Sequence, residues 1–204
     1  FTGSYDYEFD PSSKNNGRCW DLSTGKVIST YKHKFYRKYP EAIDIAFDGE
    51  HVFTGSDDGH GIAWDFNGKL LINYFEFDGT VRKVAISKNY FACACSDGII
   101  RIHNKKTGRY YKYLRNSQKE VKDIRISNDE KRIFSSSDDG TVKCFDMLTG
   151  NLLFTNAVHK SWIWSMCLFD NDQLLVTGSI DGSIAFLSAK TGQILARLLN
   201  LYWD

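Results

Sequence analysis

Adjacent carboxylates are the first side chains in this sequence that could do chemistry. Asp57-Asp58 and Asp138-Asp139 each precede a glycine, and such pairs could serve acid–base catalysis or bind calcium. Both pairs stand at the same place in a recurring pattern, however, where the turn of a β-hairpin accounts for them. We therefore expect turns at these positions, and we expect no catalytic residue, metal or cofactor.

Histidine and cysteine, the usual ligands of transition metals, show no ligand spacing. The histidines form no HxxxH or HExxH motif; they are His33, His51, His60, His103 and His159. The cysteines form no CxxC pair, and each lies in an apolar run: Cys19, Cys93, Cys95, Cys144 and Cys167. A metal site at Cys93 and Cys95 is an alternative, but core packing is favoured. Unpaired thiols favour a reducing compartment, so we expect a cytoplasmic protein, with the nucleus as the alternative.

A basic, tyrosine-rich run, Arg101–Arg115, could pair with phosphates and stack on bases. The other interpretation is that it forms the outer strands of a sheet, where charged side chains protect an exposed edge. The net charge of the whole chain is only +1, which favours the second interpretation. Binding of RNA or a ribonucleoprotein stays open as an alternative function.

Composition places the chain among globular proteins. Its 204 residues are 42% hydrophobic, enough to bury a core without disulfides. The opening FTGSYDYEFD lacks the charged and apolar regions of a signal peptide, and no apolar run is as long as a membrane span.

Two turn signals recur along the chain with one period. A Thr-Gly or Asn-Gly turn ends at Gly25, Gly68, Gly108, Gly150 and Gly192, so successive glycines are 40 to 43 residues apart. An Asp-Gly turn ends at Gly59, Gly98, Gly140 and Gly182, with spacings of 39 to 42 residues. Two independent markers with a shared period indicate a structural repeat.

Each repeat reads as four short strands. Val121–Ser127 alternates apolar and polar residues, as a half-buried strand does, and Asp139-Gly140 supplies the positive φ angles of a tight hairpin. No stretch has the length and period of a helix. Four antiparallel strands cannot bury both faces alone, whereas radial stacking covers each sheet with its neighbour. We therefore expect an all-β fold, a β-propeller of four-stranded antiparallel blades, with a solenoid of hairpins as the alternative.

The residues of the repeat resemble WD-repeat β-propellers over essentially the whole chain. Phe53–Leu71 (FTGSDDGHGIAWDFNGKLL) is similar to the Gly-Ser-x-Asp-Gly … Trp-Asp core of that family, and Gly17–Ile28 carries a second Trp-Asp. Later repeats depart from it, with His103-Asn104, Phe145-Asp146 and Leu187-Ser188 at the Trp-Asp position. The resemblance implies one propeller region, residues 1–204, with a partial repeat at 1–32 and repeats at 33–76, 77–116, 117–157 and 158–200. These are about four and three-quarter repeats, which we expect to be part of a seven-bladed ring.

The resemblance also implies a structural hydrogen-bond network of a loop histidine, a strand serine, the turn aspartate and the tryptophan. Its candidates are His33, Ser56, Asp58 and Trp64 in one repeat. In the last repeat they are His159, Ser179 and Asp181, where Leu187 replaces the tryptophan. These residues are expected to hold blades together.

One face of the propeller carries the expected binding site. In an antiparallel blade, the loop between the second and third strands lies on one face of the propeller. The loop from the fourth strand to the first strand of the following repeat lies on the same face. Two of these loops are long, Asp6–Gly17 and His33–Ile43, and long loops carry either recognition or neutral insertions. Residues beside each first inner-strand position reach this face, a common contact site in the family. We expect a non-catalytic scaffold, adaptor or sensor that binds a protein or peptide there, and an enzyme with a site at the channel mouth is the weakest alternative. The candidates are Tyr7, Phe9, Tyr36, Arg37, Asp44, Arg82, Lys122, Trp162 and Trp164.

Overall fold

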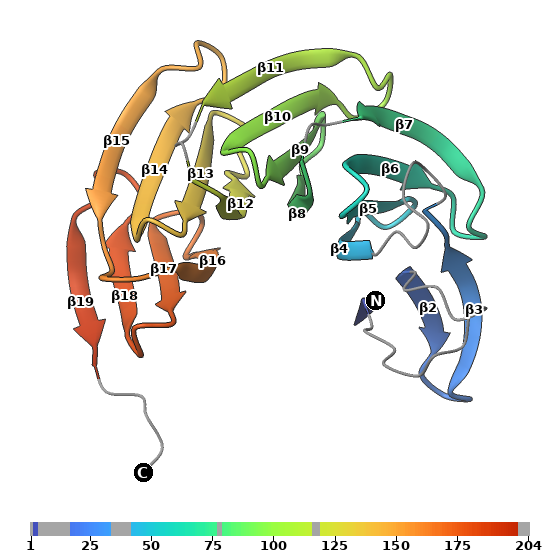
Figure 1. Ribbon diagram of the computed structural model, residues 1–204, viewed down its shortest axis with the longest axis horizontal. Coiled ribbons are helices and arrows are strands. Elements are labelled where there is room, and N and C mark those ends of the chain that lie inside the picture. Colours follow the sequence, from blue (N-terminus) through green and yellow to red (C-terminus); the bar gives the residue numbers. More distant parts are fainter. Residues whose placement is uncertain (1, 4–16, 34–41, 77–78, 116–118, 200–204) are drawn as a thin grey trace. The chain divides into compact units, whose positions relative to one another are not determined.

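The computed structural model describes residues 2–3, 17–33, 42–76, 79–115 and 119–199 (Figure 1). They form strands joined by turns, and among them no helix could cross a membrane. The chain divides into two compact units. The first holds residues 1–95 and 102–111, and the second holds residues 96–101 and 112–204. Whether residues 1–204 make one domain stays a prediction.

The first unit contains two complete sheets, each with its strands in chain order. The three-stranded sheet consists of β1 (Thr2–Gly3), β2 (Gly17–Asp21) and β3 (Lys26–Tyr31). The next sheet consists of β4 (Ala42–Phe47), β5 (Val52–Ser56), β6 (His60–Trp64) and β7 (Leu70–Glu76). The third sheet consists of β8 (Val81–Ile86), β9 (Tyr90–Cys95), β10 (Ile99–Asn104) and β11 (Tyr110–Arg115), and the division between the units passes through its last two strands.

The second unit contains two more four-stranded sheets. One consists of β12 (Val121–Ile126), β13 (Arg132–Ser137), β14 (Thr141–Asp146) and β15 (Leu152–Ala157). The other consists of β16 (Ile163–Phe169), β17 (Leu174–Ser179), β18 (Ile184–Ser188) and β19 (Ile194–Leu198). Neighbouring strands in both are antiparallel. Each four-stranded sheet lies within one of the expected repeats, and the antiparallel propeller-type sheets confirm the predicted all-β fold.

Apolar side chains are buried between successive sheets, as the repeat requires. In the first unit, Tyr31 and Cys19 pack with Val52, Ile62 and Trp64, which joins the first two sheets. A second cluster joins the second and third sheets and includes Phe53, Tyr74, Phe91, Cys93 and Cys95. In the second unit, the core between its two sheets consists of Phe134, Val142, Cys144, Val158, Ile163, Met166, Leu175, Ala185, Leu187 and Ala189. Burial against a neighbour is therefore what holds each sheet in place.

Four of the five cysteines are core residues of these clusters, and Cys167 is partly buried outside them. Cys93 and Cys95 are fully buried among apolar side chains, and all five cysteines are free thiols. Desolvation raises the pKa of the Cys144 thiol to about 12, so this side chain stays protonated at neutral pH. Within the described residues, no group of three His, Cys, Asp or Glu side chains could hold a metal ion. The burial of Cys93 and Cys95 among apolar side chains agrees with the core packing that the sequence favours.

The Asp-Gly turns form by a different backbone geometry from the one predicted. The glycines have positive φ, for example 83° at Gly59 and 78° at Gly140, but the aspartates before them do not. Each aspartate instead accepts a hydrogen bond from the backbone N–H two residues later, as Asp139 Oδ1 does from Thr141 at 2.9 Å. Aspartate therefore stabilises the turn through its side chain, and glycine alone supplies the left-handed conformation.

A β-bulge opens the inner strand of every four-stranded sheet. In β12 the register moves from Val121↔Ser137 to Asp123↔Ser136, which leaves Lys122 as the extra residue. The same shift leaves Arg82 in β8 and Trp164 in β16 as extra residues. In β4 the extra residue is Ile43. The sequence interpretation that placed Asp44 level with Lys122 was therefore wrong by one position, and Asp44 corresponds to Asp123.

Candidate functional site

The candidate site lies in the second unit, where β12 and β16 begin. These inner strands are neighbours, and both start with a bulge. A bulge re-aims the extra side chain away from the alternating pattern of the strand. Lys122 and Trp164 are the two residues concerned, and Trp162 lies just before β16. The sequence reasoning placed these three residues at one site, and the structure brings them together.

Trp162 and Trp164, the tryptophan pair, are exposed although both rings are large. Trp162 is 43% exposed and Trp164 is 62% exposed, whereas Ile163 between them is fully buried. The Ile180 N–H donates to the Trp162 carbonyl oxygen at 3.1 Å, and Ile163 pairs with Ser179 of β17. The buried isoleucine and the backbone bonds hold the segment in place, so the pair presents two indole rings on a fixed backbone.

Lys122 lies against both rings of the pair. Its Nζ is 4.8 Å from the centre of the Trp162 ring and 5.7 Å from that of the Trp164 ring, within the range of cation–π contacts. The same ammonium group donates to the carboxylate of Glu120. The side chains of Lys122 and Glu120 are only 12% and 16% exposed.

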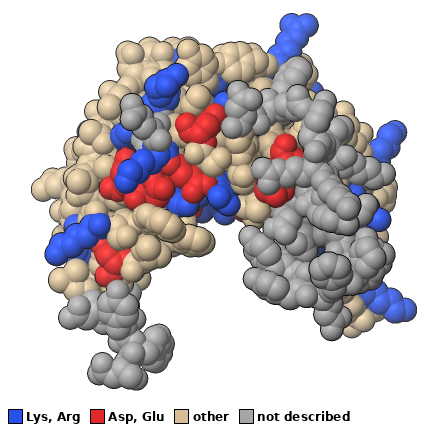
Figure 2. Space-filling model, in the orientation of Figure 1, with Lys and Arg blue, Asp and Glu red and all other residues tan. Residues whose placement is uncertain are grey.

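Glu120 is held at this position by the adjoining hairpin. Its backbone carbonyl oxygen accepts hydrogen bonds from Ser137 Oγ at 3.0 Å and from the Asp138 N–H at 3.3 Å. One carboxylate oxygen of Asp138, Oδ1, is buried and has no hydrogen-bond partner in the part of the chain that the structure describes. Figure 2 shows acidic side chains gathered, with basic ones beside them, over the part of the second unit that carries β12 and β13.

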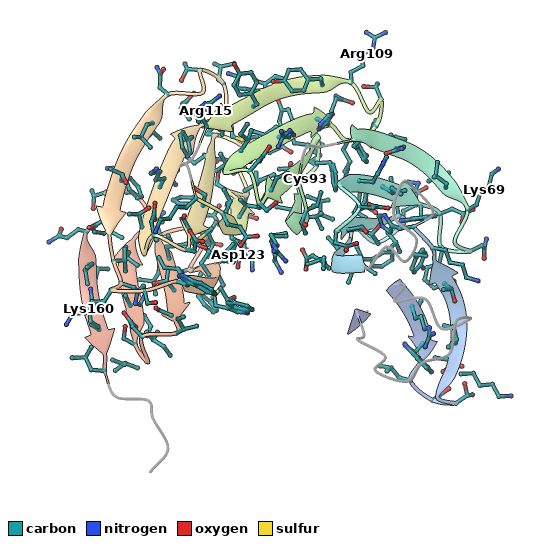
Figure 3. All side chains as sticks on the ribbon, in the orientation of Figure 1. Lys69, Cys93, Arg109, Arg115, Asp123 and Lys160 are labelled. Carbon is teal, nitrogen blue, oxygen red and sulfur yellow. The ribbon has the colours of Figure 1, made fainter. Side chains whose placement is uncertain are left out.

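Asp123 fixes β12 and β16 relative to one another (Figure 3). Its Oδ2 accepts the Met166 N–H at 2.8 Å and lies 3.4 Å from Ser165 Oγ, both on β16. Its Oδ1 is 2.8 Å from Arg125 Nη1, and the Asp123 side chain is only 2% exposed. Because Asp123 follows Lys122 and its β16 partners follow Trp164, these bonds set the distance between the lysine and the indole rings. The sequence reasoning did not single out Asp123.

Among the described residues, two of the predicted partner-binding residues, Asp44 and Arg82, lie in the first unit. The Asp44 carboxylate accepts the Val84 N–H at 2.8 Å and Lys83 Nζ at 2.9 Å, so it joins β4 to β8 as Asp123 joins β12 to β16. Asp44 therefore has a structural role, and its contact with a partner stays a prediction. Arg82 occupies the bulge position of β8 and is partly buried. Tyr7, Phe9, Tyr36 and Arg37 lie outside the described residues.

The first histidine network involves Thr54, whereas the prediction named Ser56. Trp64 Nε1 donates to Thr54 Oγ1 at 2.8 Å, and this hydroxyl lies 2.7 Å from His33 Nε2. His33 Nδ1 is 3.4 Å from Asp58 Oδ1. Desolvation acts to raise the pKa of Asp58, but the hydrogen bond and charge of His33 outweigh it and lower that pKa. Ser56 Oγ instead accepts the Asp58 N–H at 3.3 Å, within the turn.

The second network, in the last sheet, uses Thr177 where the prediction named Ser179. His159 Nε2 lies 2.9 Å from Thr177 Oγ1, and its Nδ1 lies 2.8 Å from Ser183 Oγ, which donates to Asp181 at 2.6 Å. Leu187 fills the place of the tryptophan and has no N–H to donate to the threonine, while the Ser183 hydroxyl is a second partner of His159. Ser179 Oγ donates to the Ser161 carbonyl oxygen at 3.4 Å. The sequence Thr-Gly-Ser occurs in both repeats, so the recurring threonine could have been recognised as a member of the network.

The charge states of this network depend on burial and hydrogen bonds. Desolvation lowers the pKa of His159, and Arg197 adds to this effect, while Asp181 opposes it. For Asp181, desolvation acts to raise the pKa. Hydrogen bonds from Ser183 and Lys160 and the charge of His159 nevertheless lower it to about 2. The folded state therefore binds protons less readily than the unfolded chain at both groups.

Replacing Asp181 with asparagine is expected to lower the free energy of unfolding by about 1 kcal/mol at pH 7, because hydrogen bonds to a partly exposed charge are lost. The folded carboxyl has the lower pKa, so its contribution is complete above pH 3.8 and is lost as the pH falls through about 2. Urea unfolding of both proteins from pH 7 to pH 2 should show the difference closing over that interval. Asp139→Asn, at the equivalent turn without a histidine, is the control; an equal, pH-independent loss in both variants would contradict the role of the network.

The basic run Arg101–Arg115 forms parts of β10 and β11 and the turn between them. Arg101 pairs with Asp97 at 2.6 Å, and Lys105 pairs with Asp48 at 3.0 Å. Lys112 Nζ donates to the Leu148 carbonyl oxygen at 2.6 Å. Arg109 is exposed and points away from the turn (Figure 3). Three of the cations that could have bound phosphate therefore contact the protein itself.

Comparison with known proteins agrees with this geometry. The family model described as "WD domain, G-beta repeat" matches residues 108–146 and 150–186. Autophagy-related protein 16 of Arabidopsis thaliana is 25% identical over 92% of this chain and 38% of its own length. WD repeat-containing protein 55 homolog of Dictyostelium discoideum is 23% identical over 96% of this chain and 47% of its own length.

A solved structure shares the fold over most of the chain. A chain in the crystal structure of the mitotic checkpoint complex superposes with a TM-score of 0.81 at 19% identity, over 90% of this chain and 57% of that chain. The present chain thus spans less than two thirds of these relatives. Residues 108–146 and 150–186 therefore match WD repeats, and the chain shares the β-propeller fold of WD-repeat proteins.

Proposed function

We propose that this chain is a non-catalytic interaction module that binds a protein or peptide at the tryptophan pair. The observation that carries the proposal is the exposure of two indole rings, 43% and 62%, on a backbone fixed by a buried isoleucine. Tryptophan is enriched in binding hot spots because it offers a large apolar surface with few rotatable bonds to order. WD-repeat proteins generally act as scaffolds for protein interactions, which agrees with this use.

The place of the pair in the repeat supports the same function. Trp162 lies in the connection from β15 to β16, and Asp138 lies in the connection from β13 to β14. The hydrogen bond from the Asp138 N–H to Glu120, together with the contact of Glu120 with Lys122, brings both connections to one edge of the second unit. A partner seated there meets aromatic rings with charged groups at their margin, the usual make-up of an interface centre and rim.

The RNA or ribonucleoprotein alternative has weaker support. Arg101, Lys105 and Lys112 make contacts within the protein, and Lys34–Lys38 lies outside the described residues. The five free thiols support a reducing compartment, and we propose a cytoplasmic or nuclear location on that ground.

Site-specific crosslinking tests the proposal. A photoreactive p-benzoylphenylalanine placed at Trp164 is expected to capture a partner from native lysate, because this ring is 62% exposed at the proposed site. The same residue placed at Leu148, an exposed position in the β14–β15 turn, is the control and should not capture that partner. Mass spectrometry of the crosslinked bands provides the measurement.

A double variant, Trp162→Ala with Trp164→Ala, separates binding from folding. Retention of the captured partner on immobilised protein should be lost, while the unfolding midpoint moves little, because exposed side chains are removed. Ile163→Ala, by contrast, should cost about 2–5 kcal/mol as a buried truncation. Full retention of the partner by the double variant would refute the site, and failure of the double variant to fold would show that the rings are structural.

A further inference from the structure

The tryptophan pair and Glu120 form a site that already holds a positive charge. The ammonium group of Lys122 contacts both indole rings, at 4.8 and 5.7 Å, and the Glu120 carboxylate accepts a hydrogen bond from it. Two aromatic faces with a carboxylate beside them are a recognition site for an organic cation. The side chain that fills this site comes from the protein itself.

We propose that Lys122 is an internal occupant of this site and that an arginine side chain of a peptide or protein partner displaces it. The inference rests on the function proposed above and names the chemistry of the partner. Lysine is well suited to leave, because its ammonium group is strongly hydrated and its four-carbon stem is flexible. Arginine is suited to replace it, because a planar guanidinium stacks on indole rings and donates two parallel hydrogen bonds to a carboxylate.

The surrounding charges favour a cation over an anion. When Lys122 leaves, its ion pair with Glu120 is broken, and the carboxylate can accept hydrogen bonds from the incoming guanidinium. Asp138 lies next to Glu120, with its buried Oδ1 lacking a hydrogen-bond partner among the described residues. Figure 2 shows acidic side chains, with basic ones beside them, over this part of the second unit. Lys160 is close to Trp162 in sequence, but in Figure 3 its side chain lies well away from Asp123 and the inner strands.

The displacement gives Lys122 an unusual predicted effect. If lysine competes with the incoming arginine, its removal strengthens binding; if lysine contacts an acidic partner directly, its removal weakens binding. Lys122→Met keeps an unbranched, flexible side chain without the charge. We expect this variant to bind an arginine peptide about three to thirty times more tightly, the range that one partly desolvated cation–π contact represents.

The test uses short peptides as probes of the full chain. Titration of N-acetyl-Gly-Ser-Arg-Ser-Gly-amide is followed by NMR through the indole N–H signals of the five tryptophans, assigned by single substitutions. The signals of Trp162 and Trp164 should move with the arginine peptide. They should stay in place with matched peptides that carry citrulline, the neutral analogue of arginine, or glutamate. Lys119→Met, which removes an exposed charge one residue before Glu120, is the control and should change affinity less than twofold.

Each outcome decides the proposal. Tighter binding of the arginine peptide by Lys122→Met but not by Lys119→Met supports it, and Lys122→Gln serves as the second variant if methionine disturbs folding. Unchanged or weaker binding in the Lys122 variants, or preference for the glutamate peptide, overturns it. If p-benzoylphenylalanine at position 164 crosslinks a partner while the arginine peptide moves no indole signal, the docking function stands and only this inference fails. If neither the crosslink at position 164 nor the indole shifts with the arginine peptide are observed, the docking function is rejected as well.

Discussion

Trp64→Leu is expected to lower the free energy of unfolding by about 3 kcal/mol, measured by urea unfolding followed through far-UV circular dichroism. Trp64 is buried in the cluster between the first two sheets, so a smaller side chain leaves a void there. The indole N–H also donates to Thr54, whose hydroxyl is fully buried and lies 2.7 Å from His33. Its loss removes a hydrogen bond that no water can easily replace.

The control is Trp20→Leu, which changes the same residue type at the equivalent position of the preceding repeat. Trp20 is 40% exposed, so its replacement should cost less than about 1 kcal/mol. Leucine itself fits this position in the fold, as Leu187 of the last repeat shows, where Ser183 gives His159 another partner. Equal losses in Trp64→Leu and Trp20→Leu would contradict the added stability expected from the buried packing of Trp64 and its hydrogen bond to Thr54.

The sequence predicted the repeat, the turns and the buried centre of the candidate site. Thr-Gly and Asp-Gly turns with one period located the sheets, because glycine supplies the positive φ angle at each turn. The repeat register makes Ile163 the apolar inner-strand position between Trp162 and Trp164, and its complete burial agrees with this. Local patterns of this kind are visible because they arise from the geometry of a single strand or turn.

The remaining details depend on features that a single strand does not reveal. The bulge adds one residue to each inner strand, which a pattern of simple alternation does not show. The predicted position of Asp44 along β4 was therefore wrong by one residue. In Thr-Gly-Ser, both hydroxyl residues point to the same side of the strand. His33 and His159 lie within hydrogen-bond distance of Thr54 and Thr177. The serine hydroxyls instead accept backbone N–H groups of the turns. The contact of Lys122 with the tryptophan pair joins residues 40 or more positions apart, and only the packing of two sheets creates it.

Asp123→Ala is expected to destabilise the second unit by about 3 kcal/mol, because it breaks a buried ion pair and leaves polar groups without partners. The carboxylate is 2% exposed and holds Arg125, and it accepts the Met166 N–H at 2.8 Å. Asp123→Asn keeps an acceptor for Met166 but loses the charge, so its cost should be smaller. Urea unfolding gives the overall loss, and hydrogen exchange of the Met166 amide reports on the junction of β12 and β16.

Asp129→Ala is the matched control, since Asp129 lies in an exposed turn and accepts hydrogen bonds from Ser127 and the Lys131 N–H. It should cost less than about 1 kcal/mol and leave exchange at Met166 unchanged. The alanine at position 123 should also weaken the contact of Lys122 with Trp164, because these residues directly precede the bonded positions on the two strands. If Asp123→Ala left both exchange at Met166 and the indole signals of the tryptophan pair unchanged, the carboxylate would not be what sets the spacing of β12 and β16.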